Sequence, residues 1–388
     1  MPEAAEQKRP PSITSRKSAS DNLLFWEKIA GARQTSVKKT QSRTARAFSC
    51  IIIVMRKITA IICAAIAFAA DATGTERIAT IECGKQPKQV LFAPDGKRIV
   101  VPLLDDNGFD IIRIEKSAAE KRVSPPRAGR KGFAEGLFIP EKDAFFVSQM
   151  TTGEIHEFAL PDFGYRRTIK TGGTWPKVIS WSAEKSLLAV SNWVSNDVSL
   201  IDYESGRVVR KIRTSSAPRG IAFTENGGAL VVLCFDGGKI QKFSTEDGTK
   251  TAEVSLEKAA MRHIVLGTDS NAFVTDMFHA SVYEIDLKTL AIKRKTKVAK
   301  NPNTLARKGN ILFVSCRGRN NPADYTKRSP ENGKIVVIDT KTMEIAAEIP
   351  GGNQPTGLDI SADGKTLCFS NFQDATIELW DIADMGEK

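Results

Sequence analysis

Short apolar runs separated by turn-forming residues fill the middle of the chain. Residues 187–191 and 197–201 are two such runs, and the Asn and Ser residues between them are typical of a tight β-hairpin connection. A third run at 207–212 follows the turn-forming segment 203–206, and a fourth begins at Gly220. Four short antiparallel strands cannot bury both faces of the sheet they form. We therefore expect this unit to occur in several copies.

The copies recur at a usual spacing of about 42 residues. Each copy opens with a residue that we call its anchor, usually Pro. An apolar strand and a turn follow, and then a second apolar strand that ends in a small polar residue. Four strands in a repeat of this length predict an all-β fold, a seven-bladed β-propeller of four-stranded antiparallel blades. The anchors are Pro87, Ala134, Pro176, Pro218, Met261, Pro302 and Pro355.

The last repeat is one strand short, because the chain after Pro355 has room for three strands only. Residues 77–87 align without gaps with residues 345–355, which contain the outer strand of the sixth repeat. We therefore expect the last blade to be closed by the N-terminal strand of the domain. Such closure removes the exposed strand edges that would promote aggregation.

Two motifs carry a resemblance to a known family. The sequence VSN at 190–192 with the following SNDVSLID, and FSN at 369–371 with ATIELWDI, resemble the YVTN family of seven-bladed β-propellers. The resemblance covers residues 75–382 and is strongest in the third and seventh repeats. It implies a propeller with a binding or scaffold role, and it specifies the fold far better than the function, because its residues are mostly strand and turn formers.

The N-terminal segment predicts export. Residues 1–54 are polar and basic, and we expect them to be disordered or to lie upstream of a true start at Met55. Arg56 and Lys57 precede an apolar core at 58–70 and small residues suited to cleavage, so we assign 55–72 as a signal peptide. The propeller would occupy 75–382, with a tail at 383–388, in the periplasm or outside the cell. The alternative is an inner-membrane anchor through residues 50–70.

The charge of the chain is concentrated at its N-terminus. The formal net charge is +11, but residues 1–70 hold 12 Lys and Arg against 4 Asp and Glu, which leaves +3 for the remainder. This balance argues against nucleic acid as a partner. The cysteines beyond the signal, Cys83, Cys234, Cys316 and Cys368, have no CxxC or Cys/His metal spacing, so we expect buried thiols, with no metal and no cofactor.

The candidate site lies on the face of the propeller where the loops before the first strands emerge. The residue just after each anchor is basic in four repeats and acidic in one, which predicts a ring of positive potential that could hold an anion. The alternative is that these charged residues only solvate the rim. They are Lys88, Glu135, Lys177, Arg219 and Arg262, followed by Asn303 and Thr356.

Loops between second and third strands reach the same face. Trp193, Asp276, His279 and Arg317 follow second strands directly, and aromatic and Met side chains on these loops could form an adhesive surface. The alternative is that they close the channel by packing. The one clear insertion, residues 316–334 of the sixth repeat, carries Arg319 and Tyr325, and we expect it to bind a ligand, the alternative being a plain decorated loop.

We expect an exported, non-catalytic binding or scaffold protein of the bacterial envelope. Its partner would be a protein or an anionic envelope component, and it would touch the membrane only through an uncleaved signal segment. The alternative is a lactonase-like propeller hydrolase that uses His263 or His279 with Glu135 or Asp276, although no Ser/His/Asp spacing or phosphate loop is visible. The candidate ligand-binding residues are Glu135, Lys177, Trp193, Arg219, Arg262, His263, Asp276, His279, Arg317, Arg319 and Tyr325.

Overall fold

The computed structural model of the protein describes residues 75–386 except 127–128, 130, 269 and 325–326. The extension and the signal peptide expected at 1–54 and 55–72 lie outside these residues. None of the helices in the described part is long and apolar enough to cross a membrane.

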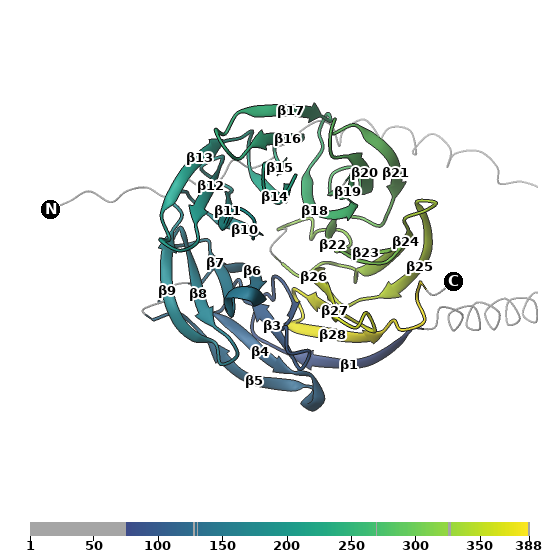
Figure 1. Cartoon of the computed structure of the whole chain (residues 1–388). Coiled ribbons are helices and arrows are strands. Elements are labelled where there is room, and N and C mark those ends of the chain that lie inside the picture. Colours follow the sequence, from purple (N-terminus) through teal and green to yellow (C-terminus); the bar gives the residue numbers. More distant parts are fainter. Residues whose placement is uncertain (1–74, 127–128, 130, 269, 325–326, 387–388) are drawn as a thin grey trace, which may run out of the picture. The chain divides into compact units, whose positions relative to one another are not determined.

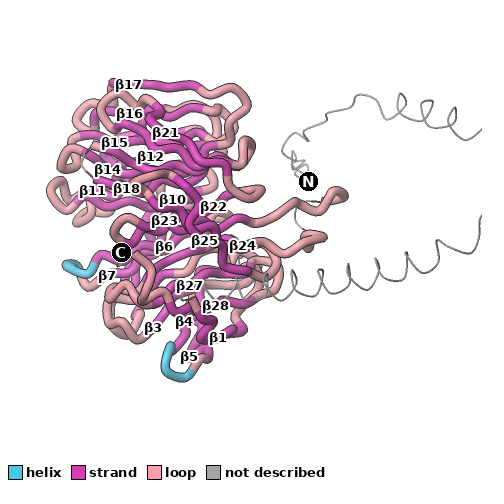
Figure 2. The backbone as a smooth tube through the Cα atoms, turned by 90° about the vertical axis from the view of Figure 1, so that its right-hand side faces the viewer, coloured by secondary structure: helices cyan, strands magenta, loops and turns pink. Residues whose placement is uncertain are grey.

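The described residues form seven four-stranded antiparallel sheets arranged as blades around an axis (Figure 1). In each blade the first strand lies next to the axis and the fourth lies at the circumference, as the labels from β6 to β9 or from β14 to β17 show. Figure 2 views the ring edge-on and shows loops that extend from one side well beyond the strands. The seven-bladed, all-β prediction is thereby confirmed.

The first four blades follow the chain in order. Their inner strands begin at or close to the predicted anchors, and two 3-10 turns connect strands in the first two blades. The elements are β2 Leu91–Phe92, β3 Arg98–Pro102, β4 Phe109–Arg113, η1 Ile114–Lys116, β5 Ala118–Val123, β6 Phe133–Ile139, η2 Pro140–Lys142, β7 Ala144–Gln149, β8 Glu154–Ala159, β9 Gly164–Lys170, β10 Pro176–Ser182, β11 Leu187–Asn192, β12 Asp197–Asp202, β13 Val208–Arg213, β14 Pro218–Thr224, β15 Ala229–Cys234, β16 Lys239–Ser244 and β17 Lys250–Ser255.

The remaining three blades include the closing strand β1, which comes from the beginning of the described chain. The long loop between β23 and β24 is the insertion expected in the sixth repeat. The elements are β18 Met261–Thr268, β19 Asn271–Asp276, β20 Ser281–Asp286, β21 Ile292–Lys297, β22 Pro302–Lys308, β23 Ile311–Cys316, β24 Lys334–Asp339, β25 Glu344–Pro350, β26 Pro355–Ile360, β27 Thr366–Asn371, β28 Thr376–Asp381 and β1 Glu76–Glu82.

The closing strand β1 pairs antiparallel with β28, as the match between residues 77–87 and 345–355 predicts. Ile81 is opposite Ile377, and both pack in one cluster with Ile99 of the first blade. Between the same two blades, Asp359 accepts a 2.8 Å hydrogen bond from the backbone N–H of Phe92, and burial raises the pKa of this carboxyl to about 6. The ladder therefore completes the last blade, and an apolar cluster and a buried polar contact join the last blade to the first.

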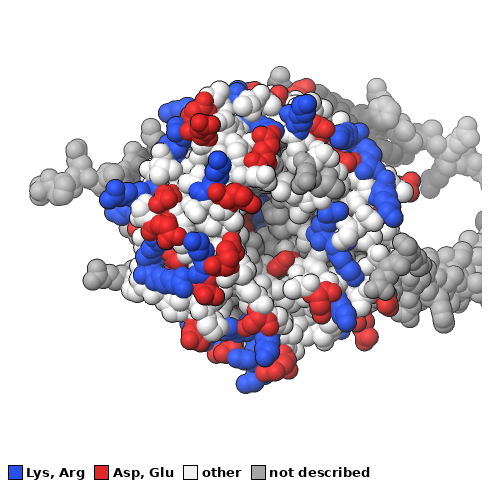
Figure 3. Space-filling model, viewed as in Figure 1, with Lys and Arg blue, Asp and Glu red and all other residues white. Residues whose placement is uncertain are grey.

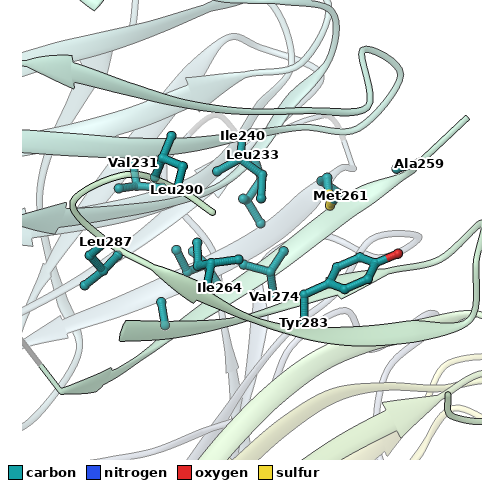
Figure 4. Close-up of a cluster of buried hydrophobic side chains, with 12 residues drawn as sticks. Val231, Leu233, Ile240, Ala259, Met261, Ile264, Val274, Tyr283, Leu287 and Leu290 are labelled. Carbon is teal, nitrogen blue, oxygen red and sulfur yellow. The ribbon is translucent and has the colours of Figure 1, made fainter. Parts of the chain in front are cut away.

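The core consists of seven apolar clusters, each of which lies between two neighbouring blades. Figure 4 shows the cluster in which Val231 and Leu233 of the fourth blade face Ile264 and Val274 of the fifth. Because every cluster needs two blades, a single blade would leave one apolar face in water. This is the physical reason for the repetition that the sequence shows.

Outer strands bury far less surface than the inner three. Strands β1, β9 and β25 share one burial pattern, in which a single residue near the C-terminal end is buried. That residue is an isoleucine in each case, Ile81, Ile169 and Ile349. The outermost strand touches the rest of the protein through one face only, so its sequence can be largely polar.

Candidate functional site

The expected ring residues lie where inner strands begin irregularly, in six of the seven blades. The antiparallel register of β10 with β11 shifts between Pro176 and Ile179, and that of β14 with β15 shifts between Pro218 and Ile221. The same shift follows the first residue of the inner strands of the second, fifth, sixth and seventh blades. An irregularity of this kind re-aims side chains, and in these six blades it lies next to the residue after the anchor.

A hydroxyl of the neighbouring blade fixes the backbone of four of these residues. The Ser191 Oγ donates a 2.8 Å hydrogen bond to the carbonyl of Arg219 and accepts a 3.2 Å bond from the N–H of Val178. Thr275 makes the same donation to the carbonyl of Asn303 at 3.1 Å. The Ser of the VSN motif is thus an interblade link that positions a channel residue. The same donation joins Ser148 to Lys177 and Ser315 to Thr356.

Five basic side chains meet in the channel. Burial is the main cause that lowers the pKa of Lys88, followed by the charges of Arg262, Arg219 and Arg317. The pKa of Lys177 is lowered by burial and by the charge of Arg219. Four of the five are nearly buried, with exposed fractions of 8% for Lys88, 7% for Lys177, 3% for Arg219 and 8% for Arg262.

One carboxylate crosses the channel to this cationic cluster, which we define as Lys88, Lys177, Arg219, Arg262 and Arg317. Glu135 Oε1 of the second blade lies 2.6 Å from an Arg219 guanidinium nitrogen of the fourth blade. Lys88, Lys177 and Arg262 form no ion pair with any described residue. Buried charge is costly unless it is paired, so the charged forms of Lys88, Lys177 and Arg262 are disfavoured in the described structure, and an anion in the channel would stabilise them.

Aromatic rings surround the cationic cluster. Trp193 has its ring 5.6 Å from Lys177 Nζ and 5.9 Å from the Arg219 guanidinium carbon. Phe372 lies 5.4 Å from Lys88 Nζ and 5.0 Å from the Arg317 guanidinium carbon. A ring face stabilises a cation without neutralising it. The aromatic rings therefore offset part of the cost of burying these cations.

Two amide side chains complete the cluster. Arg262 donates a 2.5 Å hydrogen bond to Asn303 Oδ1, and Arg317 donates to Gln354 Oε1. Sequence reasoning placed Asn303 in the ring but overlooked Gln354. The sequence feature that could have identified Gln354 is its position directly before an anchor Pro. Gln354 has a positive φ of 61°, which turns the chain into the inner strand.

The insertion of the sixth blade contributes less than its basic composition suggests. Arg319 Nε lies 3.0 Å from Glu331 Oε2 within the same loop, and its side chain is exposed. Asn353 anchors the loop, since its Oδ1 accepts a 2.9 Å bond from the N–H of Ser329 and its Nδ2 donates to the Ser329 carbonyl at 3.0 Å. Arg317 thus belongs to the cationic cluster and Arg319 does not, while Tyr325 lies outside the described residues.

The two histidines named as candidates have different surroundings. His263 Nδ1 accepts a 3.2 Å bond from the N–H of Leu305, and burial lowers the pKa of its imidazole to about 4, so it is neutral at pH 7. His279 Nδ1 lies 2.6 Å from Asp276 Oδ2 in the loop after β19. Asp276 also accepts bonds from three backbone N–H groups and from Tyr283, which makes it the anchor of that loop. No group of three or more His, Cys, Asp or Glu side chains suited to a metal ion occurs in the described part of the chain.

The other end of the inner strands carries a different kind of surface. A cavity of about 380 Å³ is lined there by Leu305, Arg307, Leu358 and Asp359, which lie further along the same strands than the ring positions Asn303 and Thr356. Figure 3 shows that Lys and Arg are interspersed with Asp and Glu around the central hollow of the face it presents. Mixed surface charge of this kind gives no local potential of one sign, in contrast to the cationic cluster.

Comparison with known proteins finds two relatives, and no family model matches the chain. The chain is 35% identical over 316 residues to the antigen Lp49 of Leptospira interrogans serogroup Icterohaemorrhagiae serovar copenhageni, a match that covers 78% of this chain and 69% of that protein. It is 25% identical over 213 residues to the uncharacterized protein YncE of Salmonella typhimurium, covering 54% of this chain and 53% of that protein. The match with YncE thus spans about half of each protein.

Proposed function

The chain belongs to the family of antigen Lp49, and from this premise we propose that it is an exported binding protein of the bacterial envelope that holds an anionic ligand in its channel. The observation that carries this proposal is the buried cationic cluster, in which Lys88, Lys177 and Arg262 have no described ion-pair partner. An anion in the channel would compensate charge that folding alone gives no reason to bury. The ligand is an anionic group carried by an envelope protein or by another, anionic component of the envelope.

We also assign the protein to the YVTN type of propeller. The support is local: the Ser of VSN links neighbouring blades, and Asn192 at the end of the motif donates from Nδ2 to Asp197 at 2.7 Å and to Ser199 at 2.9 Å. In FSN, Asn371 donates in the same way to Glu378 at 2.8 Å. The motif therefore closes the turn between second and third strands in both blades.

Replacement of Arg262 by Gln is expected to weaken anion binding about 10- to 100-fold, because a hydrogen bond to a charged group contributes about 1.5–3 kcal/mol. Binding of inorganic phosphate and of citrate to the full chain is measured by isothermal titration calorimetry. The matched control is Arg319→Gln, which removes an exposed Arg paired with Glu331 and leaves the cluster intact. A wild-type chain that binds neither anion, or equal affinities for the two variants, would contradict the proposal.

Export is expected to depend on residues 55–75. Fused to a reporter that is active only outside the cytoplasm, this segment should give activity in a bacterial host. The matched control is Ile62→Arg, which puts a charge in the apolar core and should silence the reporter. A fusion that is silent without the substitution would rule out export through this segment.

A further inference from the structure

Three buried N–H groups in the channel have no acceptor among the described residues. They are Arg262 Nε, Asn303 Nδ2 and Gln354 Nε2. Asn303 and Gln354 are fully buried, and Arg262 is 8% exposed. They come from the fifth, sixth and seventh blades, at the same end of consecutive inner strands. Leaving a buried donor without an acceptor costs about 1–3 kcal/mol, so three together require an explanation.

The orientation of the two amides is not arbitrary. Asn303 Oδ1 accepts a hydrogen bond from Arg262, and Gln354 Oε1 accepts one from Arg317. A guanidinium can only donate, so each amide must turn its oxygen towards the arginine. The nitrogen of each amide is then the free end, and exchanging O and N would place two donors against each other. The unsatisfied groups are donors in all three cases.

A set of donors with no acceptor calls for a ligand that only accepts. We propose, building on the proposed function, that Arg262, Asn303 and Gln354 form a seat for one compact oxyanion group of the ligand, a phosphate, sulfate or carboxylate. Lys88, whose charge interacts with those of Arg262 and Arg317, supplies additional positive charge to this side of the channel. An oxyanion in the seat would supply the acceptor that the two amide nitrogens and Arg262 Nε lack.

The opposite side of the channel limits the size of the anion. Glu135 is bound there to Arg219 at 2.6 Å, and its negative charge repels a second oxyanion. Lys177 on that side lies against the Trp193 ring. The ligand class is therefore a molecule with a single oxyanion head, and an extended polyanion that crosses the channel is disfavoured.

The decisive variant is Asn303→Asp, which replaces the unsatisfied amide nitrogen by an acceptor and places a carboxylate beside Arg262. Binding of inorganic phosphate and of acetate to the full chain should weaken at least about tenfold, because the seat is then filled and carries negative charge. At the same time the melting temperature of the ligand-free protein should rise by about 2 °C or more, since a buried cation gains a partner. A folding defect would instead lower both the anion affinity and the melting temperature.

Two further variants complete the comparison. Glu135→Gln removes the carboxylate opposite the seat and should strengthen phosphate binding, whereas Asn226→Asp, at an exposed turn outside the channel, should change neither affinity nor melting temperature. The ratio of phosphate to acetate affinity in the wild-type chain distinguishes a phosphoryl from a carboxylate head.

The outcomes separate the seat from the proposed function. Suppose that the wild-type chain binds phosphate. If Asn303→Asp binds phosphate equally well, or if it loses binding without a gain in melting temperature, the proposed seat is wrong, whereas the proposed anion binding still holds. If the wild-type chain binds no oxyanion, both fail. A crystal structure grown with phosphate that shows only water on Asn303 Nδ2 and Gln354 Nε2 overturns the seat as well.

Discussion

Deletion of β1, Glu76–Glu82, from the full chain is expected to lower the free energy of unfolding by about 5 kcal/mol or more and to cause aggregation. The seventh blade would lose its outer strand, whose ladder with β28 runs from Glu76 opposite Asp381 to Glu82 opposite Thr376. It would also lose Ile81, which is 2% exposed and packs between the seventh and first blades. Burial of that side chain contributes about 1.5–3 kcal/mol, and each ladder hydrogen bond adds about 1 kcal/mol.

Aggregation follows from the edge that the deletion exposes. Strand β28 would present unpaired N–H and C=O groups next to the apolar residues Ile377 and Leu379. Chemical denaturation and light scattering measure the two effects.

The matched control keeps the strand and changes its sequence. Replacing β1 by the residues of β25, Glu344–Pro350, supplies the equivalent outer strand of the sixth blade with a buried Ile at the same place. This chimera should retain most of the stability of the wild-type chain. Equal stability of the deletion variant and the wild-type chain would mean that the ring does not depend on β1 for closure.

Asp276→Ala is expected to destabilise the fold by about 3–5 kcal/mol. The side chain is fully buried, and its Oδ1 accepts bonds from the N–H groups of Ala260 at 2.9 Å, Phe278 at 3.0 Å and His279 at 3.2 Å. Its Oδ2 accepts from the Tyr283 hydroxyl at 3.0 Å. Truncation leaves these donors without their acceptor, and each unsatisfied buried group costs about 1–3 kcal/mol.

Two variants test whether the effect arises from the hydrogen bonds. Asp276→Asn keeps an acceptor oxygen and should lose about half as much stability as Asp276→Ala, while Asp162→Ala, at an exposed position in the second blade, should stay within about 0.5 kcal/mol of the wild-type chain. Urea denaturation of the three variants measures the differences. A loss for Asp276→Ala no larger than that for Asp162→Ala would show that the loop after β19 is held by other contacts.

The sequence predicted the fold because the fold is a repetition. The spacing of the anchors gave the number of blades, and the match of 77–87 with 345–355 gave the closing strand. Both inferences need only local patterns, since each blade is built from strands that are consecutive in the chain. The same repetition predicted most of the positions that reach the channel, because the residue after an anchor Pro occupies an equivalent place in different blades. The second blade departs by one residue, since Phe133 rather than Ala134 pairs as an anchor does, opposite Gln149.

The partners of those residues could not be predicted in the same way. Glu135 and Arg219 are 84 positions apart and belong to the second and fourth blades, so no local pattern connects them. Arg317 and Arg319 are two positions apart and look equivalent in sequence, yet Arg317 reaches Gln354 in the channel and Arg319 pairs with Glu331 in its own loop.

By itself, the sequence determined the blades, their closure and the ring of channel positions. Only the tertiary structure decided which charges are compensated and which donors are left without an acceptor. The physical reason is that a repeat period fixes where each backbone position lies around the axis, whereas a contact across the channel depends on the length and rotamer of two side chains from different blades. Arg262 and Asn303 illustrate this division, since the repeat places both in the ring and only their contact reveals the free donors beside it.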